Sequence, residues 1–533
     1  MGVGLVRDAV TDAPTHSATL HRLDAAVERY AFAIVIGAVV AYCTYFSWFT
    51  VLNHATYHTF AYDLGIYMQS LWTTVHGYGL FYTSLWEGSR FAYHFEPVLF
   101  ALVPLYAAFP RAETLLILQS AALGLGAIPV YLLARRHLGN VVGLGFVLLY
   151  LMSPSVHSVN GFDFHATALA VPLLLSTYYL LSAGRLRLGV LFALVALICR
   201  ENVAPVVFLM GAYWAWRWRR QDMLTVERSA LPRDRRFLVA LSLCLVAVMW
   251  FVLAVNVAIP SFAQSAAAPA LERYQGAFGN FGVDARGKLL YLLQIFGPLV
   301  FLPILAPCVL VIGASVFAEN LLSFGAGMYQ LTNHYVALLI PILFVAGIEG
   351  MTVLTGRVRP STIRLRYFIM LLMLVSTSTF ALLYSNSPIS LGRGFPVVDE
   401  HVANINRVIE LLPAEASVFS ENDLFPHVCH RREAYSIPFK FKLDFFRYDL
   451  LYGRTIVTRE DSHFDYVLMD IKSDQAMSRF MTAGSWQTLR SDYGLYAKVD
   501  GVLLYKRGFT GKPVEMSSAG YESFEQVDEG ELD

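Results

Sequence analysis

Ionisable side chains gather in an aromatic segment at residues 62–97, directly after the first strongly apolar stretch of the chain. The segment reads YDLGIYMQSLWTTVHGYGLFYTSLWEGSRFAYHFEP, so it opens on Asp63 and closes on His94 and Glu96. It is too polar to cross a bilayer and too rich in Tyr, Trp and Phe for a solvated linker. A carboxylate in a partly dry site can have a raised pKa and act as a general base. Asp63 is therefore the first candidate catalytic residue.

Other polar groups recur between later apolar stretches, in the sequences NGFDFHA, CREN and LTNHY. The residues expected to shape a site around Asp63 are His94, Glu96, Asp163, His165, Glu201, Asn202, Asn333 and His334. The cations available to bind a phosphate group are Arg200, Arg111 and Arg90. Guanidinium groups match phosphate oxygens in geometry and charge, which favours these three for that role.

Metal binding is an open alternative for part of this set. His94, Glu96 and His334 offer the nitrogen and oxygen ligands that divalent ions take. No tight spacing of ligands in the sequence singles out a particular ion. The sequence therefore predicts no cofactor outright, and a divalent ion with these three candidate ligands is left open.

Each of these residues also has an ordinary structural explanation. Asp63 could cap the helix that begins with LGIYMQSLW, since Asp is a common N-cap. Glu96 could cap the next short helix, and Asp163 could mark the start of a later one. Arg200 could form an internal ion pair with its neighbour and hold a helical hairpin. Tyr67 could belong to an aromatic belt at the membrane interface.

The composition is that of a protein with many membrane spans. Of its 533 residues 56% are hydrophobic and 15% charged, whereas soluble domains have roughly 45–50% and about 25%. The mean hydropathy of +0.51 agrees. The formal net charge is zero, so no overall charge favours nucleic acid as a partner. The five cysteines lack the spacing of a disulfide framework or a metal motif.

The sequence predicts a mostly α, polytopic membrane bundle at residues 30–385, after a cytoplasmic segment at 1–29. About eleven spans are expected, at residues 30–52, 114–133, 141–154, 166–181, 188–199, 204–216, 237–259, 289–302, 304–318, 336–354 and 367–384. An outer loop is expected at 53–112. Within it, the apolar run 98–109 has about 12 residues, too short to cross, and is assigned to the outer interface.

Lys and Arg set the expected orientation. Alternate threading of the spans leaves most of them on the side of the N-terminus, and cytoplasmic loops of membrane proteins carry such an excess. We therefore expect a cytoplasmic N-terminus and an extracytoplasmic loop around Asp63. The expected location is the plasma membrane of a prokaryote.

After Tyr384 the composition becomes that of a water-soluble domain. VDEHVANINRVIELL has apolar residues at helical intervals, ASVFSEN and DYVLMDI are typical strands, and YAKVDGVLLYKR predicts a hairpin around Asp500-Gly501. A small extracytoplasmic α/β domain is expected at 388–508. The acidic segment 510–533 is expected to be disordered.

An outer site restricts the substrates that it can use. In the transfer of a sugar to a hydroxyl, Asp63 could take the acceptor proton. Sugar nucleotides are cytosolic, so the donor is expected to be a lipid-phosphate sugar that arrives from the bilayer, together with other membrane lipid as a partner. The arginines above could bind its phosphate.

The sequence resembles the membrane family called domain of unknown function 2079 over residues 62–505. The resemblance rests on YDLGIYMQSLW, HGYGLFYTS, HFEPVLFALVPLYAAFP, LLILQSAALGLGAIPVYLLARRHLG, GFDFHATALAVPLLL, CREN, NDLFPHVCHRREAY and DYVLMD. That family is similar to the GT-C glycosyltransferases, which include protein O-mannosyltransferases and aminoarabinose transferases. The resemblance implies a polyprenyl-phosphate donor and a catalytic acid in the first outer loop, at the position of Asp63.

The family resemblance also implies that His94 and Glu96 lie where some relatives have second-site acidic or metal-binding residues. This sequence departs from the commoner acidic pair, because Leu64 follows Asp63, and Tyr93 stands where an Asp would be expected before His94.

The resulting prediction is an integral-membrane glycosyltransferase whose sugar and acceptor are undetermined. A membrane transporter or lipid flippase is a second interpretation, with Arg200 and Glu201 lining a path. A non-catalytic envelope-assembly protein is a third. A transporter should show repeat symmetry, which this sequence lacks, and an assembly protein should tolerate Asp63→Ala.

Overall fold

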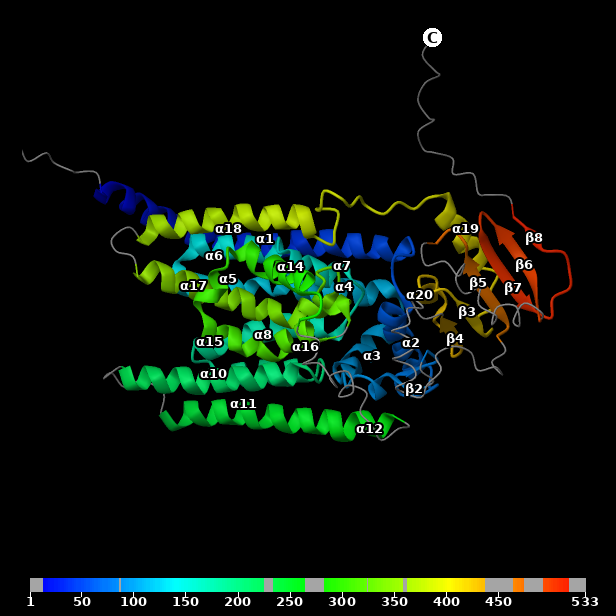
Figure 1. Cartoon of the computed structure of the whole chain (residues 1–533), viewed down its shortest axis with the longest axis horizontal. Coiled ribbons are helices and arrows are strands. Elements are labelled where there is room, and N and C mark those ends of the chain that lie inside the picture. The colour runs from blue at the N-terminus through cyan, green and yellow to red at the C-terminus, as the bar shows by residue number, and fades with distance from the viewer. Residues whose placement is uncertain are drawn as a thin grey trace, which may run out of the picture.

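The computed structural model describes residues 13–85, 88–224, 233–263, 282–323, 325–357, 362–436, 464–473 and 492–516. The protein is mostly helical, with long helices side by side and a β-sheet beyond one end of them (Figure 1). Helix α1 (Ala13–Ala55) begins at the opposite end of the bundle from the sheet (Figure 1). This is the arrangement expected if the two ends face opposite sides of a membrane.

Five helical segments are long and apolar enough to cross a membrane: Val27–Ala55, Ala112–Leu138, Arg235–Phe262, His334–Gly356 and Arg364–Tyr384. A sixth is the pair α6 (Asn140–Leu151) and α7 (Pro154–Gly161), bent by 41°. Shorter apolar helices include α3 (Val98–Ala108), α8 (Ala166–Ser182) and α9 (Leu186–Leu197). Each of the eleven predicted segments contains helix, but the number of complete spans remains a prediction.

Several helices are linked end to end. The remaining bounds in the bundle are α2 (Ile66–Val75), α4 (Ala112–Leu125), α5 (Ala127–Leu138), α10 (Val203–Leu224), α11 (Arg233–Leu253), α12 (Ile259–Phe262), α14 (Ala285–Phe296), α15 (Pro307–Leu310), α16 (Ala314–Leu322), α17 (Ile340–Arg357) and α18 (Thr362–Tyr384). Helix α10 is longer than the segment 204–216 expected from hydropathy. Its polar continuation through Arg217 is held by an ion pair to Glu349 on α17, 3.1 Å between Nη2 and Oε1.

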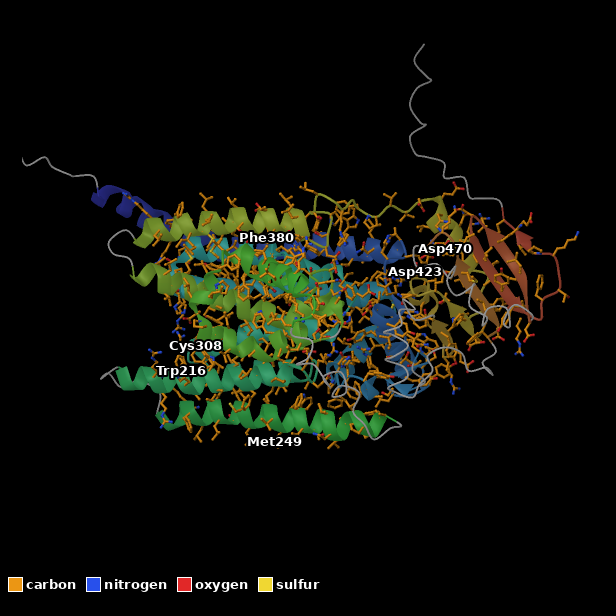
Figure 2. The ribbon with its side chains drawn as sticks, viewed as in Figure 1. Trp216, Met249, Cys308, Phe380, Asp423 and Asp470 are labelled. Carbon is orange, nitrogen blue, oxygen red and sulfur yellow. The ribbon has the colours of Figure 1, made fainter. Side chains whose placement is uncertain are left out.

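The outer helices present apolar side chains outward. Trp216 on α10 and Met249 on α11 are 44% and 62% exposed (Figure 2), and Phe368 on α18 is 64% exposed. By contrast, 83% of the most apolar part of the segment His334–Gly356, which contains α17, is buried. Helix α17 is therefore central to the bundle. An apolar outer surface of this extent is what lipid would cover.

The C-terminal part forms a six-stranded sheet in the order β4-β3-β5-β7-β6-β8. Its strands are β3 (Val418–Ser420), β4 (Ala434–Ser436), β5 (Tyr466–Asp470), β6 (Tyr493–Val499), β7 (Val502–Arg507) and β8 (Val514–Glu515). β3 runs parallel to β4 and β5, and β5, β7 and β6 are antiparallel neighbours. The predicted amphipathic helix is α19 (Glu400–Ile409), and Asp500-Gly501 forms the hairpin turn with positive φ at both residues.

Strand β8 corrects the expectation that disorder begins at residue 510. It pairs in parallel with β6, with Val514 opposite Ala497, and Glu515 forms an ion pair with Lys498. Backbone hydrogen bonds hold an edge strand in place. The acidic composition of segment 510–533 therefore did not indicate that a strand begins there. The ordered domain therefore extends to Met516, and residues 517–533 lie outside the described residues.

The sheet domain contacts the loops at one end of the bundle. The Ala61 backbone N–H donates to the Asn422 carbonyl oxygen at 2.8 Å. The Tyr106 hydroxyl on α3 lies 2.7 Å from His430 Nε2. The loop that carries Asp63 is thus enclosed between the bundle and the sheet domain.

Candidate active site

Asp63 lies in a short π-helical turn, η1 (Ala61–Gly65), that directly precedes α2. Its Oδ1 is 3.2 Å from His165 Nε2, and the His165 ring stacks on the His334 ring with 3.4 Å between centroids. These three side chains come from segments far apart in the sequence. The Asp63 side chain is 25% exposed and that of His165 only 6%, so the carboxylate is the accessible member of the pair. Isolated π-helical turns are frequent at functional sites.

Asp163 holds the turn that carries Asp63. Its Oδ2 accepts hydrogen bonds from the backbone N–H groups of Phe60, at 2.7 Å, and Leu64, at 3.2 Å. The cap considered for Asp63 is therefore supplied by Asp163, from another loop, while Asp63 is free to face His165. Asp163 does not cap α8, whose N-cap His165 makes no side-chain capping bond.

Gln119 positions the loop between α7 and α8. It is fully buried in α4, and its Nε2 donates to the carbonyl oxygens of Val159, Phe162 and Asp163 at 3.0, 3.3 and 3.3 Å. Its Oε1 accepts from the backbone N–H of His165 at 2.9 Å. One amide thus fixes both ends of the segment that carries Asp163 and His165. The sequence analysis missed this residue, although a lone Gln in an apolar run was a signal.

A second cluster surrounds Glu96, which is fully buried. Arg90 Nε donates to Glu96 Oε2 at 2.8 Å, and the Tyr67 hydroxyl donates to Oε1 at 2.8 Å. The Arg90 guanidinium lies 3.7 Å from the centre of the Tyr67 ring, a cation–π contact. Glu96 therefore acts as a partner for Arg90 and does not cap α3.

The CREN segment completes this second cluster. Glu201 Oε1 lies 2.8 Å from His94 Nδ1, and Oε2 accepts from the Phe95 backbone N–H at 2.9 Å. Arg200 Nε is 3.6 Å from Glu201 Oε1 and 4.0 Å from Glu96 Oε1, and Nη2 is 2.5 Å from His94 Nε2. The internal Arg–Glu pair is present, but it belongs to a larger network.

Tyr67 joins the two clusters. Besides its bond to Glu96, its oxygen accepts from the Ala166 backbone N–H at 3.4 Å, next to His165. It is fully buried, so it does not belong to an interface belt. Tyr67 was named in the sequence only as a neighbour, because its position in an aromatic-rich loop concealed its role.

Two of the buried carboxyls, Glu96 and Asp163, differ in their proton affinity. Burial opposes ionisation of Glu96, but Arg90 and Arg200 outweigh it and hold its pKa below the usual value. Burial raises the pKa of Asp163 well above its usual value, and the nearby charge of Asp63 raises it further. The two carboxyls therefore differ in direction because Glu96 has cationic partners, whereas Asp163 has another carboxylate beside it.

Three predicted site residues lie apart from these clusters. Asn333 Nδ2 donates to the Gly327 carbonyl at 2.8 Å, and Asn202 Nδ2 lies 3.5 Å from Glu319 Oε2. Arg111 is exposed at the N-cap of α4, and no bond found in the described ranges links it to Glu96 or Asp63.

The candidate metal ligands are divided between the clusters. His94 and Glu96 are engaged with arginines, whereas Asp63, His165 and His334 place one ligand atom each within 4.8 Å of one another. The Nδ1 of buried His334 has no hydrogen-bond partner among the described residues. An orphaned nitrogen beside a carboxylate and a second imidazole is a donor set that a divalent ion could take.

The comparisons with known proteins agree on a family and a fold. The profile described as "Predicted membrane protein (DUF2079)" matches residues 53–504. ArnT from Cupriavidus metallidurans bound to undecaprenyl phosphate superposes with a TM-score of 0.54 at 11% identity, over 89% of this chain and 97% of that one. At that identity the likeness establishes the fold alone.

Two further structures are more distant. ArnT from the same organism in the apo state gives a TM-score of 0.49 at 11% identity, over 92% and 98% of the two chains. The apo oligosaccharyltransferase from Archaeoglobus fulgidus gives 0.40 at 12%, over 90% and 75%. The comparison with curated proteins returned no match. The chain belongs to the DUF2079 family of predicted membrane proteins, and its structural neighbours are GT-C glycosyltransferases.

Proposed function

We propose that this protein is an integral-membrane glycosyltransferase that moves a sugar from a polyprenyl-phosphate donor to an acceptor at the extracytoplasmic face. The observation that carries the proposal is the accessible Asp63 carboxylate, 3.2 Å from His165 and fixed by a turn that Asp163 holds. A base held in one orientation is what proton abstraction from an acceptor needs. The undecaprenyl phosphate in the ArnT structure supports the class of donor.

The transfer balances with Asp63 as the base. The acceptor oxygen attacks the anomeric carbon of the sugar and forms the new glycosidic bond. The bond from that carbon to the phosphate oxygen breaks, and the polyprenyl phosphate leaves with the electron pair. The acceptor proton passes to the Asp63 carboxylate, while His165 keeps this carboxylate oriented.

The leaving phosphate is assigned to Arg200. Its buried Nε makes no hydrogen bond among the described residues and lies 3.6 Å from Glu201 Oε1, so a phosphate oxygen would take the place of that carboxylate beside it. Arg90 is held by two bonds to Glu96 and by the Tyr67 ring, which makes it a structural support for Arg200. The formal charges of Arg90, Arg200, Glu96 and Glu201 cancel, so the cluster contributes directed donors more than net charge.

A divalent ion would be held by Asp63, His165 and His334. When bound, it would supply positive charge to the donor phosphate.

The test is transfer from a radiolabelled polyprenyl-phosphate sugar by the full-length protein in proteoliposomes. Asp63→Asn should lower transfer by about 10²–10⁴-fold, the usual contribution of a general base. Glu410→Gln, on the exposed end of α19, is the matched control and should transfer like the wild type. Undiminished transfer by Asp63→Asn would remove Asp63 from the base role, and a wild type inactive with all donors would remove the function.

A further inference from the structure

A cavity lies away from Asp63. It has a volume of about 440 Å³ and is bounded by α14, by residues 329–332 and by the C-terminal end of α18 with the segment that follows. This volume falls within the range of small-molecule sites. Neither cluster of the candidate active site contributes a side chain to its lining.

The lining offers hydrogen bonds beside apolar surface. Asn386 is only 7% exposed, and its Oδ1 has no hydrogen-bond partner in the part of the chain that the structure describes, while its Nδ2 donates to Thr332 O at 3.4 Å. Gln330 adds an amide, and Leu290 and Leu383 add apolar contacts. A buried acceptor without a partner needs one, because an unsatisfied polar group costs free energy.

The charges in the lining do not form a phosphate site. The Asp284 carboxylate already accepts from the Gly287 backbone N–H at 3.1 Å and from the Tyr329 hydroxyl. Arg393 is the cation of the lining and lies in an exposed stretch of the chain. Amide and hydroxyl groups next to leucine side chains suit a ligand that carries hydroxyl groups on an apolar ring, which describes a carbohydrate.

The cavity and the candidate active site share a wall. The Asn386 carbonyl oxygen would lie 2.2 Å from a Cβ added to Gly161, so the two backbones touch there. The next residue, Phe162, has its ring 5.6 Å from that of His165 and 5.3 Å from that of His334. On the other side, Thr332 in the lining stands two residues before His334.

We propose that this cavity binds a carbohydrate portion of the acceptor, with Asn386 Oδ1 accepting a hydrogen bond from a sugar hydroxyl. The proposal deepens the proposed function. It rests on that function only in identifying the bound carbohydrate as part of the acceptor. It assigns the acceptor to hydroxyl-bearing glycans and places its recognition across the wall from Asp63.

The first test measures binding without any transfer. Thr332→Cys is introduced into a Cys308→Ser background, because Cys308 is exposed, and the rate of maleimide labelling is followed in the full-length protein. Methyl α-D-glucopyranoside, methyl α-D-mannopyranoside and methyl β-D-galactopyranoside are the probes, with glycerol and inorganic phosphate as comparison solutes. At least one glycoside should slow labelling severalfold, and adding Asn386→Leu should abolish this protection.

Failure of all three glycosides to protect, or protection by phosphate instead, would overturn a carbohydrate site. Protection that survives Asn386→Leu would remove Asn386 from the site. These outcomes do not depend on whether the protein transfers sugar.

The second test uses transfer, with the glycan fraction that accepts sugar from the wild type. Asn386→Leu should raise the acceptor KM about tenfold, the effect of one lost hydrogen bond, and leave the donor KM unchanged. Asn256→Leu, at an exposed amide on the outer side of the bundle, is the matched control. An unchanged acceptor KM in Asn386→Leu would show that the cavity does not serve the acceptor, whereas a wild type without any transfer would count against the proposed function alone.

Discussion

Asp63 Oδ1 and His165 Nε2 meet 3.2 Å apart, although one residue precedes α2 and the other precedes α8. The pairing fixes the carboxylate without burying it, since a quarter of the Asp63 side chain stays exposed. We expect His165→Phe to lower kcat for transfer about 10²-fold, because the base would lose its orientation. His137→Phe, in the last turn of α5, is the control. Transfer by His165→Phe at the wild-type rate would show that Asp63 needs no partner.

Gln119→Leu should lower both stability and turnover. The substitution keeps the size of the side chain but removes the two N–H donors that three carbonyl oxygens share, and the acceptor of the His165 N–H. Each buried group left without a partner costs about 1–3 kcal/mol if water does not replace it. The expected results are a lower Tm in detergent and a lower kcat with an unchanged donor KM. Thr177→Val is the control, because the Thr177 hydroxyl donates within α8, to the Leu173 carbonyl oxygen at 2.8 Å. A lower Tm with full kcat would restrict Gln119 to a structural role.

The Arg90–Glu96 pair should behave as a unit. Arg90→Met leaves the buried Glu96 carboxylate without its main cation, and breaking such a pair costs about 3–5 kcal/mol. Adding Glu96→Gln should recover part of the lost Tm, since the uncompensated charge disappears. Strictly additive losses in this double-mutant cycle would contradict direct coupling.

Metal dependence can be assigned to three side chains. EDTA should lower transfer by the wild type and Mn²⁺ should restore it, whereas His334→Leu should bind less Mn²⁺ by electron paramagnetic resonance and lose the response to EDTA. Wild-type protein that neither binds Mn²⁺ nor responds to EDTA would leave Asp63, His165 and His334 as a cluster that works without an ion.

Acid should loosen the contact between the sheet domain and the bundle. Burial is the main cause that lowers the pKa of His430 to about 4. The charges of His54, His76 and Arg431 lower this pKa further, and the charge of Glu113 opposes them. An unfolded histidine has a pKa of about 6.5, so the stability from neutral His430 is complete above that pH and falls as the pH decreases toward about 4.

The measurement is the Tm of the full-length protein between about pH 7 and about pH 5. His430→Phe should reduce the slope of Tm against pH, whatever its Tm at neutral pH. An identical slope would show that other groups cause the acid sensitivity.

Local patterns predicted much of this architecture. The apolar runs gave helices, the helical spacing at 398–412 gave α19, and Asp500-Gly501 gave the hairpin. Asp63 was recognised because a carboxylate stood alone in an aromatic loop. Each of these inferences uses residues that are neighbours in the chain.

The missing features depend on contacts between distant segments. Asp163 caps the turn of Asp63, and nothing near Asp63 in the sequence indicates that its turn is π-helical. From the sequence, Tyr67 has the properties of a membrane-interface residue. Only the fold shows that it is buried and that its hydroxyl donates to Glu96. Hydropathy alone could not show that α10 continues past Arg217, because an ion pair to α17 supports that end.

The turn of Asp63 is pinned from two sides. Phe60 and Leu64 bond to Asp163 of the bundle, while Ala61 bonds to Asn422 of the sheet domain. A Cβ on Gly65 would come within 2.6 Å of the Phe425 ring, so the sheet domain also packs directly on the turn. Neither part can therefore be exchanged independently between relatives. A chimera that replaces the sheet domain must also carry a matching segment at residues 60–65. Secretion of the sheet domain alone would expose the surface that packs on this segment.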